Sequence, residues 1–479
     1  ARRAADYVRT KRKPAVLHLS TVRLFGHAGA DAEAAYRTKA QIDAELEQDP
    51  LLSSTAALLA TTQISAEQLL KQLDTLVAQI ARVAAVASSR PKLVSAQQVM
   101  ASIAPLRDVE PTPAVLSVES RQQLFAFEQH NVGKKQHLAK LLNWALHDVL
   151  AQYKNTVVFG EDVGKKGGVY GVTQHLVHAF GSNRVINTLL DEQSILGLAI
   201  GLAQQGFIAI PEIQFLAYVH NAEDQIRGEA ATLPFFSNGQ YHNAMVIRIA
   251  GLAYQRGFGG HFHNDNSFAV FRDIPGIILL CPSNGYDAAL LLRQAVQLAH
   301  QQKRLVIFLE PIALYMTRDL ATVGDGMWLR DYPSPDAPLP SLGEPAVYGD
   351  GDELAIISYA NGYYLSRQAE LELRQQQYRI RVIDLRTLVP LHIEHIVTAL
   401  DGCRKVLIVD ECRRRGSLSE ELFTALHEAK PGQYQVQRLC AEDSFIPLGA
   451  AAYTVLPSKQ QIVQQALVML GGQVNEVVK

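Results

Sequence analysis

The sequence predicts an α/β protein in which parallel sheets carry helices on both faces. From residue 137 onward, apolar runs of strand length, such as TVVFG at 156–160 and RLVIFLEP at 304–311, alternate with segments of helical periodicity. Aliphatic and β-branched residues fill these runs almost without interruption, as in strands that are buried on both faces. A stretch rich in Pro, Gly and Asp at 319–349 then separates two such α/β regions.

The first 130 residues have a different pattern. The segment KPAVLHLSTVRL at 13–24 predicts a buried strand, because β-branched and apolar residues follow a proline. Residues 51–89 are rich in Ala, Leu, Gln and Glu at helical spacing and predict two helices. Several prolines without a clear period at 88–132 predict a connector between two units.

Charge and composition exclude several classes of protein. The formal net charge of −2 provides no broad basic field for nucleic acid or an anionic membrane. Four cysteines without a CxxC pair argue against a disulfide scaffold or zinc site and predict a reducing, cytoplasmic location. No apolar run reaches the length of about 18 residues that a membrane span needs, and no signal peptide is visible. The chain begins at Ala1 with a helix-like segment, so we expect further residues upstream.

Carboxylates follow two of the predicted strands. Glu161 comes directly after TVVFG, and Asp191 and Glu192 follow VINTLL and precede a helix. The carboxyl ends of strands in an open α/β sheet are where ligands bind. An acid at such a position is either a helix cap or a site residue. Asp191 has the position of a cap, whereas spacing alone leaves both interpretations open for Glu192.

Two histidines, His261 and His263, lie in the polar segment HFHNDNS that follows a glycine-rich turn, GFGG at 257–260. The histidines fit three interpretations, namely metal ligands, proton donors or ordinary loop residues. The turn fits either a phosphate cradle or a plain turn. From these residues alone, the protein is an α/β enzyme of unknown chemistry.

Taken together, several long segments resemble one family in both order and spacing. Four segments resemble the beta subunit of branched-chain 2-oxo acid and pyruvate dehydrogenases. They are NTVVFGEDVGKKGGVYGVT, RVINTLLDEQSILGLAIGLA, IPEIQFLAYVHNAEDQIRGEAA, and HFHNDNS running into DIPGIILLCPSNGYDA. VIDLRTLVPL, VLIVDE and LPSKQQIVQQAL resemble that subunit's transketolase-type C-terminal domain. KPAVLHLSTVRLFGHAGADAEAAYR resembles the end of the alpha subunit's diphosphate-binding domain. The chain therefore resembles an alpha–beta fusion.

The resemblance implies a thiamine-diphosphate-binding fold followed by a transketolase C-terminal-like α/β domain. The segments that we predict are a remnant of the alpha-type diphosphate-binding domain at 1–50, a helical segment and linker at 51–130, a pyrimidine-binding domain at 131–318, a linker at 319–349 and the C-terminal domain at 350–479.

The resemblance also implies roles for five residues. Glu192 matches the glutamate that hydrogen-bonds the aminopyrimidine ring and stabilises its imino tautomer, whose nitrogen removes the proton from the thiazolium carbon. Tyr218 matches an aromatic residue against that ring, and Glu161 a second cofactor-side glutamate. His263 matches the active-site histidine of the beta chain, and His27 the alpha-chain histidine that enters the site from the partner half.

The function that the resemblance implies is oxidative decarboxylation of a 2-oxo acid, branched-chain or pyruvate. The acyl group passes to the lipoyl domain of a dihydrolipoyl acyltransferase within a 2-oxo acid dehydrogenase complex. A fused chain is expected to form a homodimer and to use thiamine diphosphate and magnesium, and the family allows a potassium ion without indicating its ligands here. The alternatives are another thiamine-diphosphate enzyme, such as a transketolase or deoxyxylulose-phosphate synthase, and a non-catalytic assembly relative.

The sequence departs from the family at three places. Asn264 and Asp265 replace the usual Ser-Gln, and we expect the extra acid to alter substrate choice or the protonation of His263. Ala28 replaces the regulatory serine, which excludes phosphorylation there. The magnesium motif is missing: the triplet at 324–326 lies in the linker, too far from Asn361, and is interpreted as a turn. Because no metal ligand is assigned in this chain, we expect the ligands upstream. We also expect the 479-residue chain alone to bind thiamine diphosphate weakly or not at all, and to be inactive.

Overall fold

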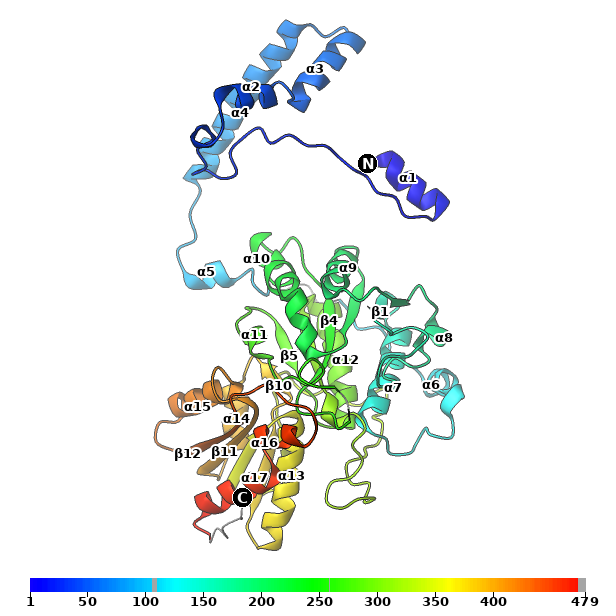
Figure 1. The fold of residues 1–479 in the computed structure, drawn as a ribbon, viewed down its shortest axis with the longest axis vertical. Coiled ribbons are helices and arrows are strands. Elements are labelled where there is room, and N and C mark those ends of the chain that lie inside the picture. Colours follow the sequence, from blue (N-terminus) through cyan, green and yellow to red (C-terminus); the bar gives the residue numbers. More distant parts are fainter. Residues whose placement is uncertain (106–109, 258, 473–479) are drawn as a thin grey trace. The chain divides into compact units, whose positions relative to one another are not determined.

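The computed structural model describes residues 1–105, 110–257 and 259–472. The chain folds as two compact units, Ala1–Val94 and Ser95–Lys479. Figure 1 shows the first unit in blue and the second from cyan to red. No helix in the described ranges is long and apolar enough to cross a membrane.

The first unit is helical. Its elements are α1 (Arg2–Lys11), η1 (Glu33–Ala35), α2 (Lys39–Leu46), α3 (Pro50–Thr61) and α4 (Ala66–Ser89). Local sequence explains the two long helices, because Asp49 caps α3 with a proline in its first turn and Ser65 forms a capping box with Gln68 at α4. These helices confirm the two predicted for residues 51–89.

The predicted buried strand at 13–24 is wrong. These residues form no strand, and most of them are exposed. A strand must pair its backbone N–H and C=O groups with a neighbouring strand. The first unit, all of which is described, contains no β-strand that could serve as that neighbour. The apolar composition of the segment is therefore not sufficient to form a strand in this chain.

The second unit opens with a seven-stranded sheet. In space its strands run β10 (Thr387–Val389), β5 (Ile278–Leu280), β6 (Leu305–Pro311), β4 (Met245–Gly251), β3 (Ile208–Ile213), β1 (Thr156–Gly160) and β2 (Val185–Asn187). All pairings are parallel except that of β10 with β5. This arrangement confirms the predicted parallel sheet. The antiparallel edge strand was not predicted.

Helices and short turns precede or connect the strands of this sheet. They are α5 (Ala96–Met100), α6 (Val118–Leu124), η2 (Ala126–Glu128), α7 (Leu138–Gln152), α8 (Leu176–Phe180), α9 (Glu192–Gln204), η3 (Leu216–Ala222), η4 (Gln225–Ala230), α10 (Leu233–Phe236), α11 (Ala269–Arg272), α12 (Gly285–Gln302) and η5 (Ile312–Leu314). One hydrophobic cluster joins α7 and α12 to the sheet, and another joins α9 to it. The two clusters show that both faces of the sheet are buried.

A five-stranded sheet follows, in the order β12 (Gln435–Ala441), β11 (Lys405–Arg413), β8 (Leu354–Ser358), β9 (Ile380–Asp384) and β7 (Ala346–Tyr348). Its helices are α13 (Ala360–Gln375), α14 (Ile393–Ala399), α15 (Leu418–Ala429), η6 (Gly449–Ala451), α16 (Ala452–Val455) and α17 (Lys459–Leu470). The cluster beneath α9 continues into this domain through residues such as Ile357 and Leu388, so the two α/β domains share a hydrophobic core.

Candidate active site

Four neighbouring strands end at one edge of the large sheet. In space their order is β4, β3, β1 and β2. Glu161 follows β1, Glu192 follows β2, Tyr218 follows β3 and His263 follows β4. Because the strands are parallel, their carboxyl ends meet at this edge, as expected for the binding edge of an open α/β sheet. The fold therefore directs four of the five predicted site residues to the same edge.

Glu192 is the first residue of α9. Its helix begins there because the Asp191 side chain accepts a hydrogen bond from the Ser194 backbone N–H at 3.3 Å, which confirms Asp191 as the N-cap. The Glu192 side chain is only 6% exposed, and Asn221 Nδ2 donates to its Oε2 at 3.3 Å. Glu192 is therefore buried at the N-terminal end of α9.

The acidic residues of the site share one electrostatic environment. Burial raises the pKa of Glu161, and the neighbouring carboxylates of Asp162 and Glu192 raise it further. Burial also raises the pKa of Tyr218, and next in effect come the charges of Glu161 and Glu192. The charge of Glu192 thus acts on both Glu161 and Tyr218 at this edge. The carboxylates therefore suit a ligand that donates hydrogen bonds, as an aminopyrimidine does.

Aromatic rings form a second wall of the site. Tyr218 Oη lies 3.3 Å from His263 Nε2. The Phe215 ring packs edge-on against the His263 ring, with centroids 4.8 Å apart, and against the Tyr218 ring at 5.4 Å. These contacts hold the imidazole in place and offer flat apolar faces beside the carboxylates. A flat, nitrogen-containing ring fits this combination.

The glycine-rich turn packs against the histidine. Gly259 has φ +50°, and a Cβ at this position would lie 2.2 Å from Nδ1 of His263. Only glycine allows so close an approach. Of the two interpretations of GFGG, the structure supports a turn that packs on His263. Phe258 of that motif lies outside the described residues.

Asparagine side chains brace the loop that carries His263. Asn264 Oδ1 accepts from the Gln255 backbone N–H at 2.7 Å, and its Nδ2 donates to the Gly259 and Gly260 carbonyls at 3.2 Å. Asn266 Oδ1 accepts from the Ala253 backbone N–H at 2.8 Å. These bonds stabilise the segment after β4, where Leu252 and Ala253 have φ values of 72° and 56°, costly for residues with side chains.

The same loop is fastened to the C-terminal domain at β11. Asn266 Nδ2 donates to the Glu411 carbonyl, and Cys412 Sγ donates to the Asn266 carbonyl at 3.0 Å. Asp265 accepts from the Ser267 hydroxyl at 2.8 Å and lies 3.8 Å from an Arg413 nitrogen. The Asn264-Asp265 departure from the family thus forms part of a junction between domains. Its predicted effect on His263 stays a prediction.

Glu411 gives this junction a pH dependence. The side chain is 2% exposed, and its Oε1 accepts from the backbone N–H groups of Asn361 and Gly362 at 3.0 and 3.4 Å. Burial raises its pKa to about 8, and Asp410 adds to the shift while the N–H bond from Gly362 opposes it. The folded protein therefore binds a proton that the unfolded chain releases at its ordinary pKa of 4.5. Stability falls as pH rises from that value to about 8.

We expect Glu411→Gln to weaken this pH dependence, because the amide resembles the protonated acid and can accept the same two N–H bonds. The midpoint of urea unfolding, measured from about pH 5 to about pH 8, should fall less with pH in the variant than in the parent. Glu428→Gln, at an exposed position of α15, is the control and should keep the parental slope. If stability falls equally steeply with pH in all three proteins, Glu411 does not hold a buried proton.

His27, the fifth predicted residue, lies in the first unit. It is exposed, and its backbone N–H donates to Asp31 Oδ2 at 2.7 Å. The Tyr36 hydroxyl donates to the same oxygen at 2.9 Å. The N–H of His27 is the main cause that lowers the pKa of Asp31. Asp31 thus organises the HAGAD loop, and the meeting of His27 with the other four residues stays a prediction.

A buried charge network that was not predicted from the sequence lies below the site. Arg248 on β4 forms two hydrogen bonds to Glu310 on β6, at 2.7 and 2.9 Å, and one to Glu212 on β3 at 2.5 Å. The Tyr315 hydroxyl also donates to Glu310. Burial and the charge of Glu310 raise the pKa of Glu212, although Arg248 opposes the shift. A lone arginine in the apolar run MVIRIAG was the available signal, because buried charges require partners.

The residues around 324–326 form a turn. The Asp325 carboxylate accepts from the backbone N–H groups of Leu320, Ala321, Thr322 and Met327 at 2.7–3.0 Å, and these bonds lower its pKa to about 2. This geometry confirms the turn interpretation of the Gly-Asp-Gly triplet. Within the described ranges, no three His, Cys, Asp or Glu side chains gather closely enough to hold a metal ion.

Comparison with known proteins shows which family the chain resembles. Three family models match the chain: "Dehydrogenase E1 component" at residues 1–94, "Transketolase, pyrimidine binding domain" at 134–317 and "Transketolase, C-terminal domain" at 343–462. The pyruvate dehydrogenase E1 component subunit beta of Staphylococcus epidermidis is 31% identical over 336 residues, covering 69% of this chain and 97% of that protein. The Staphylococcus aureus protein of the same name is 30% identical over the same shares.

The chain belongs to the thiamine-diphosphate-dependent 2-oxo acid dehydrogenases. It joins an alpha-type segment to a beta-type part, as the resemblance implied. A split-gene transketolase, described as an inactive beta4 tetramer, has a similar fold, with a TM-score of 0.55 and 17% identity over 70% of this chain and 99% of that one. The predicted fold class is thus confirmed for this 2-oxo acid dehydrogenase component.

Proposed function

We propose that this dehydrogenase component decarboxylates a 2-oxo acid and transfers the acyl group to a lipoyl group of a partner acyltransferase. The carbon–carbon bond to the carboxylate breaks, carbon dioxide leaves, and the electron pair reduces the lipoyl disulfide. One sulfur then carries the acyl group and the other becomes a thiol. The observation that carries the proposal is the buried Glu192 at the start of α9, within the electrostatic reach of Glu161 and Tyr218.

In this proposal, each residue of the site has a separate role in binding the cofactor or the substrate. The Glu192 carboxylate would accept a hydrogen bond from a protonated ring nitrogen of the aminopyrimidine and so fix its tautomer. The Tyr218 ring provides a flat face for that pyrimidine, and Glu161 offers a second acceptor. His263, held by Phe215 and Gly259, donates a hydrogen bond or proton to the substrate oxygen. Thiamine diphosphate, when bound, supplies the nucleophilic carbon and the electron sink.

We further propose that the alpha-type domain holds the diphosphate and magnesium, and that His27 belongs to a site completed by that half. We also propose that the protein forms a homodimer. Support for the homodimer comes from the surface next to Glu192, where Leu189, Leu190 and Leu198 are 85%, 67% and 41% exposed. Large apolar side chains grouped beside a site are typical of an interface. A potassium ion stays part of the proposal without assigned ligands.

An assay of carbon dioxide release tests the proposal. Protein expressed from the complete gene, supplied with thiamine diphosphate and magnesium, should release labelled carbon dioxide from pyruvate or a branched-chain 2-oxo acid when an artificial electron acceptor is present. A lipoyl domain should then become acylated in the absence of that acceptor. Transfer of a two-carbon ketol unit from a ketose phosphate, without decarboxylation, would instead support the transketolase alternative. Inactivity on both substrates would favour the assembly relative.

A further inference from the structure

A second cavity lies away from the predicted catalytic residues, between the two α/β domains of the second unit. Its volume is about 750 Å³, within the range of about 300–1,000 Å³ that is usual for small-molecule sites. Residues 253–256 line one side together with parts of 313–321, α13 lines another, and Tyr453 with residues 456–460 closes the third. Glu161, Glu192, Tyr218 and His263 do not line it. Clefts between domains are favoured positions for ligands.

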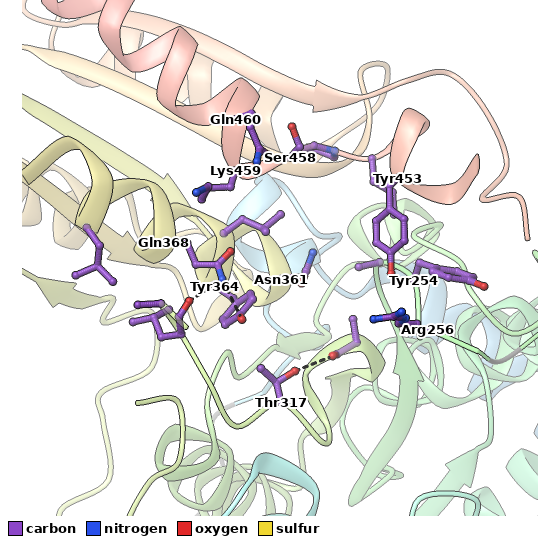
Figure 2. A pocket seen from close by; sticks show the side chains of 18 of the residues that line it. Tyr254, Arg256, Thr317, Asn361, Tyr364, Gln368, Tyr453, Ser458, Lys459 and Gln460 are labelled. Atoms are coloured by element: carbon purple, nitrogen blue, oxygen red, sulfur yellow. Dashed lines mark hydrogen bonds between the residues drawn. The ribbon is translucent and has the colours of Figure 1, made fainter. Parts of the chain in front are cut away.

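The lining combines flat rings, amides and cations. Figure 2 shows Tyr453 and Tyr254 with Arg256 on one side of the cavity, and Tyr364 with Gln368 on the other. The rings of Tyr254 and Tyr453 pack edge-on with centroids 5.7 Å apart. The Tyr254 hydroxyl is fixed because it accepts from the Gly449 backbone N–H at 3.0 Å. The exposed ring of Tyr453, packed against the fixed ring of Tyr254, suits a planar ring as ligand.

Charge in the cavity is positive on balance. Lys459 is paired with Glu372 at 2.8 Å. Within the described residues, no acidic side chain forms an ion pair with Arg256, whose guanidinium lies beside the two tyrosines in Figure 2. Amide side chains of Gln255, Asn361, Gln375 and Gln460 also line the cavity and can both donate and accept hydrogen bonds. An anionic ligand with a hydrogen-bonding ring matches this set.

We propose that this cleft binds a nucleotide-like small molecule, a planar nitrogen heterocycle that carries an anionic group, and that its occupancy alters the catalytic loop. Tyr254, Gln255 and Arg256 form both the cavity wall and the segment that leads to His263. The Gln255 backbone N–H donates to Asn264 Oδ1 at 2.7 Å, one residue from that histidine. Movement of the wall is therefore transmitted directly to the loop. Binding itself does not depend on the proposed reaction.

Calorimetric titration with adenosine and guanosine monophosphates tests the site. At least one nucleotide should bind saturably, with a Kd below about 1 mM. Adenosine alone and inorganic phosphate alone should each bind more weakly, because each lacks half of the recognised groups. Tyr453→Ala and Arg256→Ala should weaken nucleotide binding about tenfold or more, whereas Tyr453→Phe should retain most of it. An unchanged Tm verifies that each variant is folded.

Two variants outside the cleft serve as matched controls. Tyr241 is 56% exposed, close to the 55% of Tyr453, and Arg415 is an exposed arginine of the C-terminal domain. Tyr241→Ala and Arg415→Ala should bind the nucleotide like the parent. Absence of saturable binding by either nucleotide, or equal loss in the control variants, would overturn the site.

Coupling to the catalytic loop is measured separately. In the complete enzyme, saturating nucleotide should change the KM for the 2-oxo acid by about fivefold or more, the lower end of known coupling between sites. Asn264→Ala should keep nucleotide binding but reduce this effect, because it removes the acceptor of the Gln255 N–H. If Asn264→Ala lowers the Tm, Asn264→Asp keeps an acceptor oxygen and should keep the coupling. Nucleotide binding with an unaltered KM would contradict the coupling.

Discussion

Glu192→Gln is expected to lower the rate of decarboxylation by about 10²–10⁴-fold, the usual contribution of a general acid–base group. The amide has the size of the carboxylate, and its oxygen can still accept from Asn221, so the start of α9 should keep its structure. It lacks the negative charge, however, and cannot favour a protonated ring nitrogen. We therefore expect kcat to fall much more than the KM for the 2-oxo acid rises.

Steady-state kinetics of the complete enzyme, with an artificial electron acceptor, measures this loss. Glu229→Gln, at an exposed glutamate of the same domain, is the control and should leave kcat unchanged. Unfolding of the variant is monitored by its Tm, so that a loss of fold is recognised as such. Parental kcat in Glu192→Gln would contradict the catalytic role and favour the non-catalytic relative.

Arg248→Met is expected to lower the free energy of unfolding by about 3–5 kcal/mol, the range for breaking a buried ion pair by removing one partner. Arg248 is 1% exposed and is the common partner of Glu310 and Glu212. Without its charge, the carboxylates of Glu310 and Glu212, on the two strands that flank β4, would be left uncompensated. The parallel sheet that carries the site would lose its central cross-strand bridge.

Urea unfolding measures the loss, and a second substitution tests its cause. Glu310→Gln added to Arg248→Met should restore part of the stability, because it removes one of the uncompensated charges. Arg404→Met, at an exposed arginine of the C-terminal domain, should change stability by no more than about 0.5 kcal/mol. A loss in Arg248→Met no larger than in that control would show that the network does not stabilise the sheet.

The parallel sheet could be predicted because its strands are short, apolar runs that alternate with periodic helices. Local signals were also sufficient for α17, which begins after the Ser458 capping box as the pattern near Lys459 indicated. Strands β7 and β12 were missed, because both lie at sheet edges and mix polar with apolar residues. The antiparallel pairing of β10 with β5 joins two domains, and no local pattern encodes such a contact.

The position of the carboxylates at this edge could be predicted for a related reason. A residue that lies between the end of a parallel strand and the next helix, as Glu161 does after β1 and Glu192 at the start of α9, lies toward the carboxyl-end edge of the sheet. Asn221 and Phe215 were missed, because their roles depend on how the chain turns after β3. The bonds from Asn266 to β11 were missed as well, since they join residues 145 positions apart. Long-range polar contacts of this kind leave no periodic signal in the sequence.

The central claim is that the edge formed by β4, β3, β1 and β2 holds the pyrimidine of thiamine diphosphate against Glu192. A crystal structure of the complete gene product with thiamine diphosphate and magnesium tests this claim most directly. The account predicts a Glu192 carboxylate oxygen within about 2.6–3.2 Å of a ring nitrogen, with the Tyr218 ring against the pyrimidine. A cofactor bound elsewhere, with Glu192 making no contact to it, would contradict the account.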